Sequence, residues 1–408
     1  MTLDPIEVTK QLVAISSVNP FKTIEREGKT IGLGNEGEIN IFLEGLLRSL
    51  GFSVRRQPVD DSGERYNLLA EKGSGTESVL LFGHTDTVDV KQGWESDPFS
   101  AAEKVVDGRK RLYGLGVNDM KSGLAAILAA LARVKESALK VKVAFLVDEE
   151  FWSFGAVKLV ESDFLDDVVL AIAPEIGGAD YSPEVQWIGV GMVGRCEYEF
   201  NLKGRACHGA DAWTDSNAVS AVHEAVKLEG IIIDYCKRVS RKIELAGIPV
   251  YNSSFLSHHQ GGLPMLSVPD AASFVLDRSF LPGEDTQREI ETLNSLVKQA
   301  KDQGLIDERL EVRIAERARP TPFCRPHFFE PSTPAIARTL KILQKSGVEY
   351  QLGIGRSVAD ENRIASRGIP TLTMGPWGAG SHTPQEWVDV ESVVRLAETL
   401  EAVTRSLS

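Results

Sequence analysis

The sequence predicts an α/β fold with a largely parallel sheet and helices on both faces, interrupted by an inserted α+β domain. In the first 190 residues, short apolar runs alternate with segments of helical periodicity, as in a sheet built from βαβ units. Between residues 191 and 316, strands and helices no longer alternate, and from residue 317 the first pattern returns. We therefore expect one domain formed by residues 1–190 and 317–408, and a second formed by residues 191–316.

The composition restricts the classes of function. A chain of 408 residues is too long for one ordinary core, so two domains are the default. The net charge of −13 disfavours a nucleic-acid partner, which needs a basic surface, and is compatible with a carboxylate-rich site that binds cations. No apolar run reaches the roughly 18 residues of a membrane span, and the N-terminus does not resemble a secretory signal. Four scattered cysteines without a C-x-x-C pair fit a reducing cytosol, so we expect a cytoplasmic protein that binds neither nucleic acid nor membrane.

The helices expected in the first domain have recognisable ends. Asp4–Ser16 has helical character, and Leu124–Val134 follows a glycine-containing loop. The sequence Asn35-Glu36-Gly37-Glu38 matches a capping box, with Asn35 as the cap of a helix over residues 39–50. A polar, glycine-containing loop is expected over Gly353–Asn362, and the last helix over Val390–Ser406.

Three apolar strands are each followed by side chains that can bind metals. The strand at residues 79–82 leads to His84, the strand at 141–147 leads to Glu149 and Glu150, and the strand at 168–173 leads to Glu175. In an open α/β sheet, ligands bind beyond the carboxyl ends of the strands. Asp119 precedes a helix on a loop that contains two glycines. These residues are therefore expected to meet at one edge of the sheet.

At this edge, we expect different roles for Asp86, Glu149 and Glu150. Residues i and i+2 of an extended chain share a face, so the carboxylate of Asp86 can lie beside the ring of His84 and orient it. The same alternation predicts that Glu149 and Glu150 point apart, so that one can bind metal and the other act as a base. The simpler alternatives are that His84 and Asp86 are ordinary loop residues, and that Glu149 and Glu150 are an acidic pair exposed to solvent.

Four motifs together resemble the M20 metallopeptidase family. They are G-H-x-D-x-V from Gly83, Y-G-x-G-x-x-D-M-K-x-G from Tyr113, D-E-E from Asp148 and G-x-x-S-H from Gly378. That family includes acetylornithine deacetylases, succinyl-diaminopimelate desuccinylases, aminoacylases, glutamate carboxypeptidases and dipeptidases. The resemblance extends over essentially the whole chain and implies a phosphorylase/hydrolase-like zinc-peptidase fold with an inserted lid.

The resemblance implies a site for two divalent metal ions, with zinc expected first and cobalt or manganese as alternatives. It assigns one ion to His84, Asp119 and Glu175. It assigns the other ion to Asp119, Glu150 and His382, so that Asp119 is shared between the two. Glu149 is then the general base for a zinc-activated water, and Asp86 orients a ligand. The resemblance also implies a cis peptide bond after Asp119.

In the inserted domain, the resemblance implies residues that hold the substrate. His208 matches a histidine that helps to bind the carbonyl oxygen, Asn217 belongs to the same motif, and Arg278 matches an arginine that binds a carboxylate. A surface role for His208 and a structural ion pair for Arg278 stay open. The inserted domain resembles a lid through which the family forms homodimers.

We therefore expect a metallohydrolase that cleaves the amide bond of an N-acyl amino acid or of a small peptide with a free carboxylate. The alternatives are a dipeptidase, carboxypeptidase or aminopeptidase with the same two-zinc site, or a non-catalytic metal-binding relative. Trp152 and Ser267 depart from the family pattern, and they lie where substrate choice is expected. The acyl group, the amino acid and the native metal stay open.

Overall fold

The chain forms two compact units. A computed structural model describes residues 2–26, 28–60, 65–135, 137, 139–176, 181–262 and 265–407. The first unit comprises Met1–Gly191, Phe328–Gly355 and Ala359–Ser408, and the second comprises Met192–His327 with Arg356–Val358. The sequence had placed the end of the second domain at residue 316.

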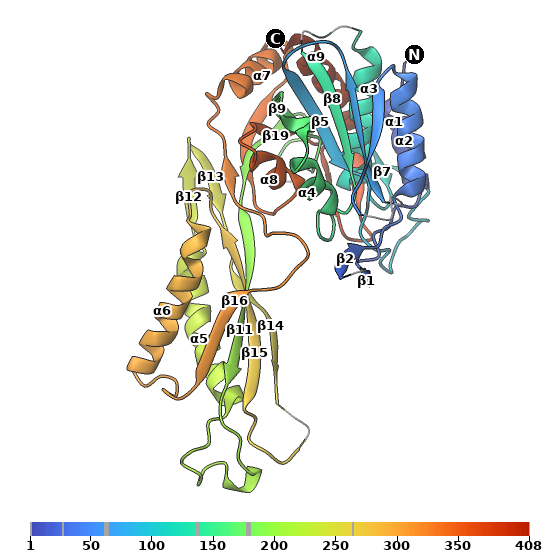
Figure 1. Ribbon diagram of the computed structural model, residues 1–408. Helices are drawn as coiled ribbons and strands as arrows, with labels where there is room; N and C mark the ends of the chain where they lie inside the picture. The colour runs from blue at the N-terminus through green and yellow to red at the C-terminus, as the bar shows by residue number, and fades with distance from the viewer. Residues whose placement is uncertain are drawn as a thin grey trace. The chain divides into compact units, whose positions relative to one another are not determined.

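The first unit contains a nine-stranded mixed sheet with a parallel centre (Figure 1). Across the sheet, the parallel neighbours are β19 (Thr371–Thr373), β9 (Val168–Ala173), β5 (Ser78–His84) and β8 (Lys140–Leu146). The antiparallel strands that flank this centre are β4 (Tyr66–Lys72) and β3 (Ser53–Pro58) on one side, and β10 (Gln186–Met192), which pairs with β17 (His327–Phe328) and β18 (Tyr350–Gly355), on the other. The predicted α/β fold with a largely parallel sheet is confirmed.

Helices cover both faces of this sheet. On one face, α1 (Pro5–Ala14), α3 (Ser122–Arg133) and α9 (Val390–Ser406) pack against one another. On the other face, α4 (Phe154–Val160) and α8 (Asp360–Ala365) pack over a core that includes Leu80, Phe82 and Leu146. Successive residues of a strand face opposite sides, so Phe82 faces α4 while its neighbour Gly83 lies against Leu124 of α3. Helices α2 (Gly37–Ser49) and α7 (Pro334–Lys345) also belong to this unit.

Two local predictions were wrong. Asn35 does not cap α2: its side-chain Nδ2 donates to the backbone oxygen of Ser16, and the N-cap residue Glu36 makes no capping hydrogen bond. The Glu36 side chain is instead buried in an ion pair with Arg65. Residues 353–362 were expected to form a polar loop, but they contain the end of β18 and the start of α8, a short helix whose polar residues are all buried.

A small sheet joins two loops that carry motif residues. It consists of β20 (Gly378–Ala379), β21 (Trp387–Asp389), β7 (Arg109–Tyr113) and β6 (Ala102–Val106), in this order. Since β7 leads into the loop of Asp119 and β20 leads into the loop of His382, the pairing of β21 with both strands draws these loops together. A separate hairpin is formed by β1 (Thr23–Arg26) and β2 (Lys29–Gly32).

The second unit is an antiparallel sheet covered by two helices. The strands, in order, are β14 (Phe255–Gly261), β15 (Ala271–Phe280), β11 (Gly194–Lys203) and β16 (Glu311–Glu316). Alternate residues of β11, among them Tyr198 and Phe200, pack against α5 (Ala221–Val239) and α6 (Glu289–Asp302). The hairpin of β12 (Lys242–Leu245) and β13 (Ile248–Tyr251) completes this unit. Helix α5 begins at Ala221, where the side chain of Ser220 caps it.

All four cysteines are free thiols, and three of them, Cys196, Cys236 and Cys324, are buried. Within the described ranges, we find no helix with the length and apolar character required to cross a bilayer.

Candidate metal centre

The candidate metal ligands lie where the parallel strands of the first unit end. His84 is the last residue of β5, Glu150 follows β8, and Glu175 follows β9. His382 comes after β19, on the loop beyond Gly375. Because β19, β9, β5 and β8 are parallel neighbours, these side chains gather at one edge of the sheet.

Two histidines face a shared carboxylate. Nε2 of His84 lies 3.1 Å from Oδ1 of Asp119 and 2.9 Å from Oε1 of Glu175. Nε2 of His382 lies 3.2 Å from Oδ2 of Asp119 and 2.9 Å from Oε2 of Glu150. Each oxygen of Asp119 therefore belongs to a different group of one imidazole and two carboxylates, which is the arrangement of a bridging ligand.

The loop that carries Asp119 is held by a buried carboxylate. Glu386 accepts hydrogen bonds from the backbone N–H groups of Gly116 (2.9 Å), Asn118 (2.8 Å) and Asp119 (3.1 Å). The peptide bond between Asp119 and Met120 is cis, as the resemblance implies. Burial raises the pKa of Glu386 to about 8, although these backbone hydrogen bonds lower it.

Two glycines allow the other segments to approach the Glu175 segment closely. A Cβ atom on Gly123, near the start of α3, would clash with the backbone oxygen of Pro174. A Cβ atom on Gly375, after β19, would clash with the backbone oxygen of Glu175. Side chains at these positions would push apart the elements that bring Asp119 and Glu175 together.

Asp86 connects His84 to the backbone of the acidic turn. Its carboxylate accepts from the backbone N–H groups of Glu149 (3.1 Å) and Glu150 (3.2 Å), and from Nδ2 of Asn19 (3.0 Å). Nδ1 of His84 lies 3.0 Å from the backbone oxygen of Asp86 and 3.5 Å from its carboxylate. The expected orientation of His84 by Asp86 thus runs mainly through a backbone oxygen, and the carboxylate fixes the turn.

Glu149 and Glu150 lie on a turn, so strand alternation does not separate them as predicted. Strand β8 ends at Leu146, and Asp148 turns the chain with φ +69°. Glu150 contacts His382, whereas burial raises the pKa of Glu149 well above its usual range, although His84 opposes this. Burial likewise raises the pKa of Glu150 to about 7. The turn at Asp148, and not strand alternation, therefore sets how Glu149 and Glu150 lie, with Glu150 against His382.

The electrostatics and the donor atoms fit divalent cations. The hydrogen bonds that His382 donates to Asp119 and Glu150 raise its pKa to about 10. Burial alone would lower the pKa of His84, but Glu175 and Asp119 raise it well above its usual range. These raised pKa values show that the surrounding carboxylates stabilise positive charge at the two imidazoles. Ligand atoms of His84, Asp119 and Glu150 lie within 4.8 Å of one another, and imidazole and carboxylate donors suit zinc, cobalt or manganese.

His208 and Asn217 lie in loops of the second unit. Nδ1 of His208 accepts from the backbone N–H of Ala210 (3.2 Å), and His208 forms an isolated bridge with Ser267. Asn217 is exposed, and its backbone N–H donates to Asp215 (2.9 Å).

Arg278 is enclosed within the second unit. Its side chain is 4% exposed, and its Nε lies 3.0 Å from Glu289 and its Nη2 3.3 Å from Glu284. Nη1 donates to the backbone oxygen of Ser279, and Tyr235 donates to Glu289 (2.6 Å). In this arrangement both sides of the guanidinium serve internal partners, as the structural alternative anticipates.

Sequence reasoning missed several buried residues that support the site. They are Asn19, Arg65, Asp148 and Glu386. Asn19, Arg65 and Glu386 lie outside the metal-site motifs, and each of the four comes from a different segment. Asp148 carries the only prior signal, because it opens the D-E-E motif. The rest become visible only through their contacts in three dimensions.

The comparisons agree with this geometry. The sequence model of peptidase family M20/M25/M40 matches residues 80–406 of this chain. Acetylornithine deacetylase from Proteus mirabilis is 28% identical over 390 residues, covering 94% of this chain and 92% of the relative. Acetylornithine deacetylase from Erwinia tasmaniensis is 29% identical over 391 residues, with the same coverage of 94% and 92%.

Solved structures share the fold. A tripeptidase from Staphylococcus aureus has a TM-score of 0.72 at 19% identity, covering 98% of this chain and 97% of its own. A dinuclear metal-binding M20 peptidase from Bacillus subtilis has a TM-score of 0.70 at 15% identity, covering 99% and 97%. A family description that matches most of the chain, together with relatives that match nearly all of it, shows that the chain belongs to peptidase family M20/M25/M40 and is a hydrolase of amide or peptide bonds.

Proposed function

We propose that this enzyme cleaves the amide bond of an N-acyl amino acid or of a short peptide, with two divalent metal ions as cofactors. His84, Asp119 and Glu175 would hold one ion, and Asp119, Glu150 and His382 the other. Zinc is the first candidate, since imidazole nitrogen and carboxylate oxygen are its usual ligands outside thiolate sites.

The observation that carries the proposal is the position of Asp119 between two histidines. Its two oxygens lie 3.1 Å and 3.2 Å from the Nε2 atoms of His84 and His382. A shared carboxylate is how two cations are held close together in hydrolytic sites. A purely structural cluster would have no need to aim both imidazoles at the same group.

When bound, the metal ions supply Lewis acidity, which polarises a carbonyl group and makes water a stronger nucleophile at neutral pH. Glu149 then acts as the general base: its carboxylate accepts a proton from the attacking water and returns it to the leaving nitrogen. A raised pKa suits this cycle, because the same group must both accept and release a proton near neutral pH. Asp86 keeps the Glu149 and Glu150 backbone in place through two hydrogen bonds.

The names of the relatives support an acyl amino acid as the first substrate class. Two relatives that match nearly the whole chain, at 28% and 29% identity, are acetylornithine deacetylases. The substrate panel described below identifies the acyl group and the amino acid. We propose His208 and Asn217 as substrate contacts from the second unit. Arg278 is proposed only as a structural residue, because Glu284 and Glu289 already bind its guanidinium.

A second candidate is a peptidase that acts on substrates with a free amine. The enclosed Arg278 favours it, since the case for a carboxylate-bearing substrate depended on that side chain being available. The tripeptidase of similar fold is compatible with this candidate.

We also propose a homodimer formed through the second unit. Strand β14 is an edge strand of its sheet, and β14 and α5 expose Phe255 (51%), Val226 (60%) and Ile233 (43%). An exposed edge strand is a template for pairing. Light scattering tests this, and a monomeric mass at working concentration would exclude it.

The deciding experiment is hydrolysis of a substrate panel by zinc- or cobalt-loaded protein. The panel contains N-acetyl, N-formyl and N-succinyl amino acids and dipeptides with free or blocked termini. Glu149→Gln should keep its metal and lose about 10²–10⁴-fold in kcat. Full activity of Glu149→Gln, or of the chelated wild type, would contradict the proposal. Cleavage only of peptides with a free amine would favour the second candidate.

A further inference from the structure

The geometry points to Arg65 as a positioning residue for the candidate metal centre, which acts through Asp148 and Asn19 on the Asp86 carboxylate. This inference rests on the proposed function. Arg65 contacts none of the five candidate ligands in the contacts described above. Its effect has to pass through the residues between, and each step is visible.

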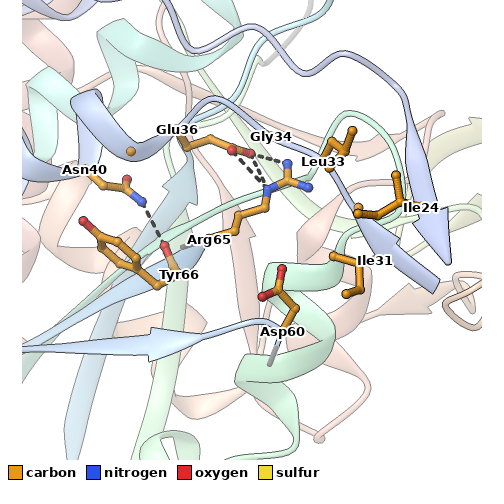
Figure 2. A pocket seen from close by; sticks show the side chains of 11 residues that line it. Ile24, Ile31, Leu33, Gly34, Glu36, Asn40, Asp60, Arg65 and Tyr66 are labelled. Atoms are coloured by element: carbon orange, nitrogen blue, oxygen red, sulfur yellow. Dashed lines mark hydrogen bonds and ion pairs between the residues drawn. The ribbon is translucent and has the colours of Figure 1, made fainter. Parts of the chain in front are cut away.

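Arg65 lies directly before β4 and is buried between two carboxylates. Its side chain is 6% exposed, and Nη1 lies 2.9 Å from Oδ1 of Asp148, which is fully buried. On the other side, Nε lies 3.0 Å from both oxygens of Glu36, and Nη2 also contacts Glu36. Figure 2 shows this second pair, with the guanidinium of Arg65 facing the carboxylate of Glu36.

One side-chain amide links the two inner carboxylates. Nδ2 of Asn19 lies 2.9 Å from Oδ1 of Asp148 and 3.0 Å from Oδ2 of Asp86. An amide group has two N–H donors, and here each carboxylate receives one. Asp148 Oδ1 is thus shared between Arg65 and Asn19, so a shift of Asp148 would also shift the donor of Asp86.

The inner carboxylates hold the backbone that carries the base and a ligand. Asp86 accepts from the N–H groups of Glu149 and Glu150. Asp148 accepts through Oδ2 from the N–H groups of Trp152 and Phe154, both at 3.2 Å. The turn from residue 148 to residue 154 is therefore fixed at both ends by carboxylates. Asp148 itself adopts φ +69°, a left-handed conformation that is uncommon for residues other than glycine.

Arg65 supplies the positive charge that this arrangement lacks. Asp86 and Asp148 share one neutral amide and are both fully buried, so their mutual repulsion is little screened. The carboxylate of Asp148 has Arg65 as its ion-pair partner. Without that partner, Oδ1 of Asp148 loses the contact that holds it in place, and a shift of Asp148 moves the amide that Asn19 donates to Asp86.

The two carboxylate partners of Arg65 lie in different surroundings. Arg65 and Glu36 line a pocket of about 130 Å³ with Ile24, Ile31 and Leu33 (Figure 2), which is large enough to admit water. Loss of the arginine would leave Glu36 beside this pocket, but Asp148 with 0% exposure. The damage should therefore fall on the side of Asp148 and the metal centre.

The test compares Arg65→Met, Asp148→Asn and the double variant. Isothermal titration of zinc into metal-free protein gives the affinity, and the panel substrate gives kcat and KM. We expect Arg65→Met to weaken zinc binding and to lower kcat by about tenfold or more, with KM changed less than about twofold. Because both residues act in one chain of contacts, the double variant should match the more damaging single variant. Losses that multiply would overturn the inference.

Two control variants separate positioning from a general loss of buried charge. Lys142→Met removes a buried cation from the ion pair with Asp167 near the amino end of β8, and should leave zinc affinity unchanged. Adding Glu36→Gln to Arg65→Met relieves the other unpaired carboxylate, and should not restore zinc affinity. Restoration, or an equal loss in Lys142→Met, would reduce Arg65 to a structural residue and overturn the inference.

Folding and the proposed function are checked separately. If Arg65→Met does not fold, as judged by circular dichroism, the neutral Arg65→Gln replaces it, and an affinity equal to wild type would overturn the inference. A wild type that binds zinc and cleaves no substrate would contradict the proposed function, while the zinc titrations would still decide the role of Arg65.

Discussion

The carboxylate of Glu386 accepts a hydrogen bond from the backbone N–H of Asp119 at 3.1 Å. The same carboxylate binds the N–H groups of Gly116 and Asn118, so one side chain sets the course of the loop that carries the shared ligand. Glu386 is 1% exposed, and an acceptor with three partners has no equivalent among neutral side chains.

This relationship predicts that Glu386→Gln weakens metal binding about tenfold, the usual order for residues that support a ligand. Glutamine has one acceptor oxygen for three donors and introduces an N–H₂ group where backbone N–H groups converge. Zinc titration into metal-free protein measures the loss. The matched control is Glu391→Gln, a carboxylate with 69% exposure at the start of α9, for which we expect wild-type affinity. Equal affinities of the two variants would disprove the prediction.

Metal stoichiometry should separate the shared ligand from the others. In His84→Ala only the group with Glu175 is damaged, so we expect one ion per chain to be lost. In Asp119→Asn both groups are damaged, so we expect both ions to be lost. Elemental analysis after dialysis against a weak chelator gives the numbers. Two retained ions in Asp119→Asn would show that this residue does not bridge.

The positions of the candidate ligand side chains could be predicted because the relevant pattern is local. An apolar strand that ends in a histidine or a glutamate places that side chain at the rim of a parallel sheet, whatever the rest of the chain does. His84, Glu150 and Glu175 follow this rule, and the structure brings them near Asp119 and His382.

The supporting residues could not be predicted because their partners are distant in sequence. Glu36 lies in a capping-box pattern, yet its carboxylate pairs with Arg65, 29 residues later. Asn19 and Asp148 are separated by 129 residues. Local sequence preferences predict such residues to be helix caps or loop residues. Their ion pairs and hydrogen bonds to distant segments become visible only in the folded structure. The division of Glu149 and Glu150 failed for a related reason, since alternation ends where Asp148 bends the chain.

The ion pairs of Asp167 should make stability depend on pH in acid. Burial alone would raise its pKa, but hydrogen bonds from Lys140 and Lys142 lower the pKa of Asp167 to about 2. A folded-state pKa below the unfolded value of about 3.8 stabilises the protein above pH 4, and this contribution is lost as the pH falls from about 4 to about 2.

Asp167→Asn should therefore lower the free energy of unfolding at pH 7 by about 1 kcal/mol, reduced from the full value because the site is partly exposed to solvent. Urea denaturation followed by circular dichroism measures it, and the difference from wild type should shrink below pH 4. Asp163→Asn is the control, since that carboxylate is 83% exposed. A difference that stays constant down to pH 2 would refute the assignment.

Substitution of Arg278 distinguishes an internal ion pair from a substrate anchor. Arg278→Met leaves Glu284 and Glu289 without their shared cation, in a setting where the arginine is 4% exposed. Breaking a buried pair in this way costs about 3–5 kcal/mol, so we expect a clear loss of stability in urea. KM should change equally for substrates with a free and with a blocked carboxylate, because the guanidinium is not offered to the substrate. A KM increase confined to free-carboxylate substrates, at unchanged stability, would instead make Arg278 the anchor that the family resemblance implies.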